Sequence, residues 1–227
     1  MDFKNLDYRK CEKKWYIVKD KEEVEILDEI TKNKQGGNLY IGYIYIDHYQ
    51  GLSMFLIGKG EIKDRELKFF TTLDDLSTHS FAMTNNIICG FDRFRAYSIE
   101  GIAINSDVKD VVEEFIYNEF YDEIETKKPF IIKYRNDENE DINRAEQYPD
   151  SISFLLSKDG LEDELMWGRV EGFHPVDKEI RAVLLDDPFE KQYGLCKGDV
   201  VGLVKDLEKF DGYIAITGYK KDKKFKI

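Results

Sequence analysis

The sequence predicts an α+β protein in which an antiparallel sheet with packed helices is followed by a small, strongly bent β-rich module. β-prone runs bounded by turn residues recur through the chain, for example at 39–46 and 180–184. Two other stretches, 21–34 and 107–125, repeat apolar residues at helical spacing. A polar, acidic segment at 136–150 separates the two parts of the chain.

The length of 227 residues fits either one large domain or two small ones. The acidic segment favours two: an α+β domain with an antiparallel sheet at 1–135, an acidic linker or loop at 136–150, and a small β-rich module at 151–227. Hydrophobic residues make up 42% of the chain and aromatic residues 14%. This content suffices for a folded core and argues against disorder of the whole chain.

The charge balance is strongly acidic, with 34 basic and 46 acidic residues and a net charge of −12. A chain of this charge repels a phosphate backbone, so nucleic acid is disfavoured and a basic protein is the favoured class of partner. No run approaches the roughly 20 apolar residues of a membrane span, and the first residues do not resemble a secretory signal. Three scattered cysteines argue against a disulfide framework. We therefore expect a cytoplasmic protein without a membrane segment.

The N-terminal part is predicted to open with a strand at 15–18, followed by an amphipathic helix at 21–34. Apolar residues recur there every three positions among glutamates, and the glycine pair at 36–37 ends the helix, because glycine adopts the left-handed conformation that helix ends favour. Further strands forming an antiparallel meander, with a short helical connection, are expected as follows: strands at 39–46, 52–57, 67–72, 81–91 and 94–104, and the connection at 73–76.

The clearest helix is predicted at 107–125, with Ser106 or Asp107 as its N-cap. Its apolar side follows i, i+3, i+4 spacing through Val108, Val111, Val112, Phe115, Ile116 and Phe120. Between residues 98 and 126 there are nine acidic residues and one lysine, a net charge of −8. A solvated helix face is the ordinary interpretation. The more specific hypothesis is that this helix is a docking surface for a basic protein partner. The candidate residues of that surface are Glu113, Glu114, Asp122 and Glu123.

A single strand at 130–134 is expected to end the first domain. In the C-terminal part, strands are predicted at 152–156, around Trp167, before and after an acidic corner, and at 213–217. The acidic corner is Asp186-Asp187-Pro188-Phe189, and a Gly198-Asp199 turn leads into the strand that follows it.

This C-terminal part, about 151–217, resembles a bacterial family described as domain of unknown function 2314. The matching pattern is an acidic residue before a tryptophan-bearing strand, then an Asp-Pro corner, then a Gly-Asp-x-Val turn. The residues that match are Glu164, Trp167, Asp187, Pro188, Gly198, Asp199 and Val201. The resemblance implies a small, strongly bent β module in a bacterial protein, in a neighbourhood whose proteins sometimes resemble immunity proteins that neutralise toxins. It brings no catalytic residues.

Residues with catalytic or metal-binding chemistry are isolated in the sequence. His48, His79 and His174 share no short ligand spacing, so no zinc site is predicted. Cys89 lies in an apolar run where a thiol is inert, and Cys196 precedes a lysine but has no histidine near it in the sequence. Nucleophile-elbow and phosphate-binding glycine motifs are absent from the sequence. We therefore predict no catalytic residue, no metal and no cofactor.

Two features of the C-terminal part admit both a structural and a functional interpretation. Asp186, Asp187 and Asp199 would supply oxygens for a hard cation, but an Asx-type turn before Pro188 is the favoured interpretation. Trp167 would serve as a binding platform, but its apolar neighbours favour a role as the core anchor of the module.

The favoured function is a non-catalytic, immunity-like interaction protein that binds a basic protein partner through its acidic surface. The alternative is an enzyme or small-ligand-binding protein with a cleft between the two parts. In that case Trp167, Asp186 and Asp187 would lie at the edge of the cleft. The sequence identifies neither the partner nor the oligomeric state.

Overall fold

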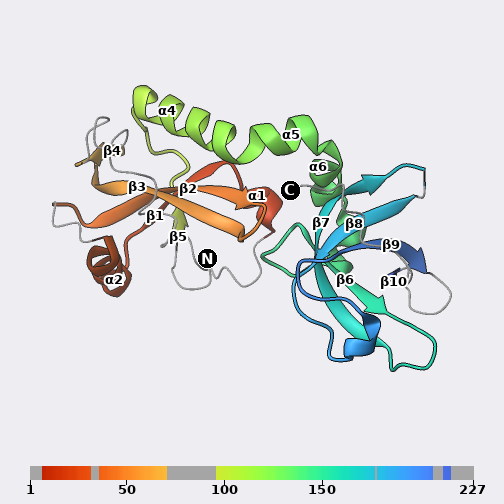
Figure 1. Cartoon of the computed structure of the whole chain (residues 1–227). Coiled ribbons are helices and arrows are strands. Elements are labelled where there is room, and N and C mark those ends of the chain that lie inside the picture. Colours follow the sequence, from red (N-terminus) through yellow and green to blue (C-terminus); the bar gives the residue numbers. More distant parts are fainter. Residues whose placement is uncertain (1–6, 32–35, 71–95, 177, 207–211, 216–227) are drawn as a thin grey trace. The chain divides into compact units, whose positions relative to one another are not determined.

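The computed structural model describes residues 7–31, 36–70, 96–176, 178–206 and 212–215 (Figure 1). The chain divides into two compact units, Met1–Asp122 and Glu123–Ile227. The first unit contains a five-stranded sheet and the second a closed five-stranded barrel, and helices accompany both. The α+β prediction is therefore confirmed.

The sheet of the first unit has the strand order β4-β3-β2-β1-β5, and every neighbouring pair is antiparallel. Its strands are β1 (Lys14–Val18), β2 (Leu39–Asp47), β3 (Gly51–Lys63), β4 (Glu66–Phe69) and β5 (Ala96–Ser98). The predicted strands at 15–18, 39–46 and 52–57 are confirmed, whereas the strand expected at 67–72 ends at Phe69. The strand predicted at 81–91 and the helical connection at 73–76 lie outside the described residues.

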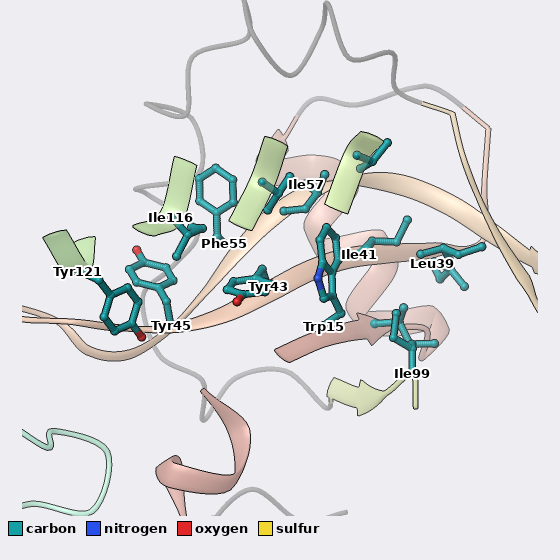
Figure 2. Close-up of a cluster of buried hydrophobic side chains, with 14 residues drawn as sticks. Trp15, Leu39, Ile41, Tyr43, Tyr45, Phe55, Ile57, Ile99, Ile116 and Tyr121 are labelled. Carbon is teal, nitrogen blue, oxygen red and sulfur yellow. The ribbon is translucent and has the colours of Figure 1, made fainter. Parts of the chain in front are cut away.

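Helices contribute to the core on both faces of this sheet. Successive residues of β2 point to opposite faces, so Tyr40 and Ile44 join the core that includes α1 (Tyr8–Cys11) and α2 (Lys21–Thr31). Tyr43 and Tyr45 face the opposite core, which contains buried residues of α4 (Ser106–Ile116) and of the π-helical turn η4 (Tyr117–Tyr121). Figure 2 shows Ile116 and Tyr121 with the aromatic rings of this second core.

Helix α4 begins one position earlier than predicted. The N-cap is Asn105, whose side chain accepts a hydrogen bond from the Asp107 N–H, so neither Ser106 nor Asp107 is the cap. Val108, Val112 and Ile116 are buried as expected, but Val111 is 49% exposed. The apolar stripe of the helix is therefore narrower than its sequence suggests.

The second unit contains a barrel that closes in the order β10-β6-β7-β8-β9. Its strands are β6 (Ser151–Leu156), β7 (Glu164–His174), β8 (Glu179–Leu184), β9 (Val200–Asp206) and β10 (Gly212–Ala215). All neighbouring pairs are antiparallel except β10 with β6, which are parallel. A bulge between Val170 and Gly172 bends β7. The module that was predicted to be strongly bent is thus a closed barrel.

The strand predicted at 130–134 is wrong, because this segment lies in helix α6 (Pro129–Asn136). Proline at the first helical position lacks the N–H that would be unsatisfied there. At the other end, the buried Arg144 guanidinium donates hydrogen bonds to carbonyls of Tyr134 (2.8 Å) and Arg135 (3.0 Å). These contacts satisfy carbonyls that the end of a helix leaves without an intrahelical partner.

The predicted linker at 136–150 is also corrected. The two units divide between Asp122 and Glu123, within α5 (Asp122–Lys127), and 136–150 belongs to the second unit. Its 3-10 turn η5 (Glu138–Asn143) buries Glu140 and Asn143 despite the acidic sequence. A second 3-10 turn, η6 (Lys191–Tyr193), lies between β8 and β9. Within the described part of the chain, no helix is long and apolar enough to cross a bilayer.

Candidate functional site

The first candidate site is the exposed side of helix α4. Residues 107, 110, 111, 114 and 117 recur at intervals of three and four and therefore share one side of the helix. Their side chains are all exposed: three are carboxylates, and the other two are Val111 and Tyr117, which are 49% and 41% exposed. We call this set, Asp107, Asp110, Val111, Glu114 and Tyr117, the α4 outer face.

Aromatic packing and one long-range hydrogen bond hold α4 in place. The indole Nε1 of Trp15, on β1, donates a hydrogen bond of 3.1 Å to the Glu113 carboxylate. Phe115 and Phe120 contact the rings of Phe55 and Tyr45, with centroids 5.5 Å and 4.2 Å apart (Figure 2 labels the sheet residues). The helix therefore presents its outer face on a well-packed support.

The π-helical turn η4 continues this attachment. Ile116 and Tyr121 are both buried although they are five residues apart, which matches the wider spacing of a π turn. The Tyr121 hydroxyl accepts a hydrogen bond from the Ile46 N–H (3.0 Å) and donates one to Glu12 (3.1 Å). The extra residue in the turn thus brings a tyrosine hydroxyl to the backbone of β2.

The four acidic residues predicted to bind a partner have different environments. Glu114 is exposed and belongs to the α4 outer face, whereas Glu113 is half-buried and bound to Trp15. Asp122 is exposed at the end of the first unit. Glu123 lies in the second unit, where it forms an exposed ion pair with Lys127 at 3.6 Å. Asp107 and Asp110 were missed as candidates, although their helical spacing from Glu114 was readable in the sequence.

The acidic corner of the second unit is held by hydrogen bonds from backbone N–H groups. Asp187 accepts one from Lys197 (2.7 Å), and Asp199 accepts one from Cys196 (2.9 Å). Glu164 accepts two, from Phe189 and Glu190, both at 2.8 Å. These contacts support the interpretation of Asp187 and Asp199 as turn residues. Asp186 is exposed.

Trp167 is not the core anchor that its neighbours suggested. The inward-facing residues of β7 are Met166, Gly168 and Val170, whereas Leu165 and Trp167 are 60% and 38% exposed. Successive residues of β7 point to opposite faces, and each face carries apolar side chains. The sequence therefore does not show which face is turned to the core.

No group of three or more histidine, cysteine, aspartate or glutamate side chains suited to a metal ion occurs among the described residues. His48 is buried and makes an edge contact with the Tyr49 ring, and His174 is half-buried on β7. His79 and Cys89 lie outside the described residues. Cys196 is exposed, and its thiol donates to the Asp199 carboxylate at 3.4 Å.

A second candidate site, which the sequence did not predict, is a cavity of about 220 Å³ at one end of the barrel. It is lined by Phe130, Lys133 and Tyr134 of α6, by Asp137 and Glu140, and by Phe173, Lys178, Ile180, Leu203, Lys205 and Tyr213. Its lining comes from α6, from η5 and from four strands, so no local pattern in the sequence indicates it.

Comparisons with protein-family models, with curated protein sequences and with solved structures found no match to this chain. The resemblance to domain of unknown function 2314 therefore stays a prediction. Two places in the structure bear on function: the α4 outer face and the cavity at the end of the barrel, called the barrel-end cavity below.

Proposed function

We propose that this chain is a non-catalytic, immunity-like interaction protein of the bacterial cytoplasm that binds a basic protein partner through the α4 outer face. The observation that carries the proposal is the position of two exposed apolar side chains, Val111 and Tyr117, among the carboxylates of Asp107, Asp110 and Glu114.

Each component of this face has a distinct role in the proposal. Carboxylates attract a basic surface over several ångströms and raise the association rate, but exposed ion pairs add little affinity. Exposed apolar side chains supply contact area that is removed from water on binding. Val111 and Tyr117 are therefore expected to provide affinity, and the three carboxylates to provide steering and selectivity.

The charge of the face is not neutralised along the helix. Lys109 is the one basic residue of α4, and at about 100° per residue it lies beside Asp110 and Tyr117 but on the side away from Asp107, Val111 and Glu114. The acidic composition of the whole chain acts in the same direction, since its net charge is −12. A partner with a basic surface matches this field, whereas nucleic acid does not.

The test is affinity capture from a bacterial host lysate with three tagged proteins: the natural chain, an outer-face variant and a control. The outer-face variant is Asp107→Asn/Asp110→Asn/Glu114→Gln. The control is Glu22→Gln/Glu25→Gln/Glu29→Gln, which removes the same charge from exposed positions of α2. The proposal requires a basic protein that is retained by the natural chain and the control, lost from the outer-face variant, and released by added salt.

Capture of the same protein by all three would contradict the proposal, as would a partner that is acidic or insensitive to salt. The Tyr117→Ala variant separates the contribution of apolar contact to affinity from the contribution of the carboxylates to the association rate. It is expected to accelerate dissociation while leaving the association rate nearly unchanged, because it removes contact area without changing charge.

The alternative function, an enzyme or small-ligand-binding protein with a cleft between the two units, stays a prediction. The barrel-end cavity gives a specific reason to examine small-ligand binding within the second unit alone.

A further inference from the structure

The barrel-end cavity is formed by the last inward-facing residues of four strands and by one helix. Phe173 of β7 pairs with Ile180 of β8, Ile180 pairs with Leu203 of β9, and Lys205 pairs with Tyr213 of β10. Helix α6 adds Phe130 and Tyr134, which pack against the same core as the barrel interior.

The polar groups that line the cavity on the side of η5 are already bonded within the protein. The buried Glu140 carboxylate accepts hydrogen bonds from Tyr213 Oη (3.0 Å) and Asn143 Nδ2 (3.1 Å), and it pairs with Lys205 Nζ at 3.4 Å. Tyr134 Oη donates to the Ser151 carbonyl at 2.9 Å. These groups shape the wall of the cavity, and Lys205 compensates the charge of Glu140.

Two further lysines line the cavity without such compensation. Lys133 of α6 and Lys178, which precedes β8, are both exposed, and neither makes an ion pair with any residue that the structure describes. Asp137, the remaining carboxylate of the lining, accepts hydrogen bonds from the backbone and side chain of Asn139. Those bonds come from neutral groups, so Asp137 keeps its charge; with three lysines and two carboxylates the lining still has a net charge of +1, although the chain as a whole is strongly acidic.

A flat apolar surface completes the lining. The rings of Phe130 and Phe173 stack with centroids 5.0 Å apart and an interplanar angle of 23°. Phe173 remains 41% exposed although it lies at an inward-facing position of the barrel. An exposed ring at such a position offers a face against which a planar ligand gains contact area.

We propose that the barrel-end cavity binds a small organic anion that carries a flat aromatic ring. Lys133 and Lys178 receive the anionic group, a carboxylate or a phosphate, and the ring lies against Phe173. Because the Asp137 carboxylate, at the start of η5, would repel an anion placed there, the charged group points towards Lys133 and Lys178. This site lies wholly within the second unit and does not depend on the α4 outer face.

The test uses naphthoate as the probe and naphthamide, which has the same shape but no charge, as its control ligand. Binding is followed by amide chemical-shift changes in the full chain. Naphthoate is expected to shift resonances of α6, β7 and β9, and naphthamide to bind more weakly. Lys133→Gln/Lys178→Gln should weaken naphthoate binding about tenfold, as expected for the loss of two exposed ion pairs. Phe173→Ala should weaken both ligands.

The matched control is Lys191→Gln/Lys197→Gln, which removes two exposed lysines that do not line the cavity. It should leave naphthoate binding unchanged, and the amide spectra of all variants report whether they are folded. The proposal is overturned if naphthoate shifts no cavity resonance at its solubility limit. It is equally overturned if the Lys133/Lys178 variant and the Lys191/Lys197 variant weaken naphthoate binding to the same extent. Equal affinities for naphthoate and naphthamide would also overturn it.

Discussion

Arg135 and Asp150 form a buried, bidentate ion pair. Arg135 Nε and Nη2 each lie 2.7 Å from a different oxygen of the Asp150 carboxylate, and the two side chains are 3% and 4% exposed. The pair joins the end of α6 to the start of β6. It explains why the acidic segment between these elements is a fixed part of the second unit.

Removing one partner of this pair should destabilise the second unit strongly. Asp150→Ala leaves the Arg135 guanidinium buried without its counter-ion, which costs about 3–5 kcal/mol. Glu123→Gln, which breaks an ion pair whose side chains are about 70% exposed, should cost less than about 1 kcal/mol. Urea unfolding followed by circular dichroism measures both. Similar losses for the two variants would show that the buried pair has no special importance.

Two glycines of β7 should respond differently to the same substitution. A Cβ on Gly168 would lie 3.0 Å from the Ala182 Cβ and 3.2 Å from a ring carbon of Phe154, inside the barrel. A Cβ on Gly172 would meet no atom within 4 Å. Gly168→Ala is therefore expected to cost about 1–3 kcal/mol through overpacking. Gly172→Ala should be neutral or slightly stabilising. Thermal unfolding of the two variants compares them, and equal midpoints would refute the packing described for β7.

The cysteines should differ in reactivity. Burial, with Asp7 adding a smaller effect, raises the pKa of the Cys11 thiol above its usual value. Cys196 is exposed. Because the thiolate is the reactive form, iodoacetamide at neutral pH should modify Cys196 and spare Cys11 in the folded protein. Peptide mass spectrometry resolves the two sites, and urea-unfolded protein, in which both react, is the control. Rapid labelling of Cys11 in the folded state would contradict its burial.

Alkaline pH should reduce stability because buried tyrosines resist ionisation. Burial raises the pKa of Tyr43, with Glu113 and Glu12 adding to the effect, and burial likewise raises the pKa of Tyr45 and Tyr134. The unfolded chain therefore loses these protons first, from about pH 10. Stability is complete below that pH and falls as the pH rises above it.

Urea midpoints measured between about pH 8 and about pH 11 test this dependence. Tyr43→Phe should reduce the loss of stability at the alkaline end, since it removes one group that the folded state keeps protonated. Tyr49→Phe, at a side chain that is 59% exposed, is the control. An alkaline loss of stability that is the same in both variants would contradict the assignment to Tyr43.

The strands were predictable because β-branched and aromatic residues are concentrated between clear turn signals, as in β2 and β6. The segment 130–134 was assigned incorrectly because Ile131 and Ile132 suit a strand, whereas Pro129 and the distant Arg144 determine the helix. The sequence does not show which side of β7 faces the core, because the adjacent residues Met166 and Trp167 point to opposite sides and both are common in protein cores. The barrel-end cavity depends on residues from four strands and a helix, so no local pattern could reveal it.

The parallel pairing of β10 with β6 places the two ends of the 151–215 segment side by side in the barrel. During synthesis, β6 leaves the ribosome long before β10 does. Until then, the edges of β6 and β9 that β10 will occupy offer unpaired backbone groups to neighbouring chains. The first unit needs no residue beyond Asp122 for its sheet. Newly made protein is thus most prone to aggregate in the interval before β10 emerges.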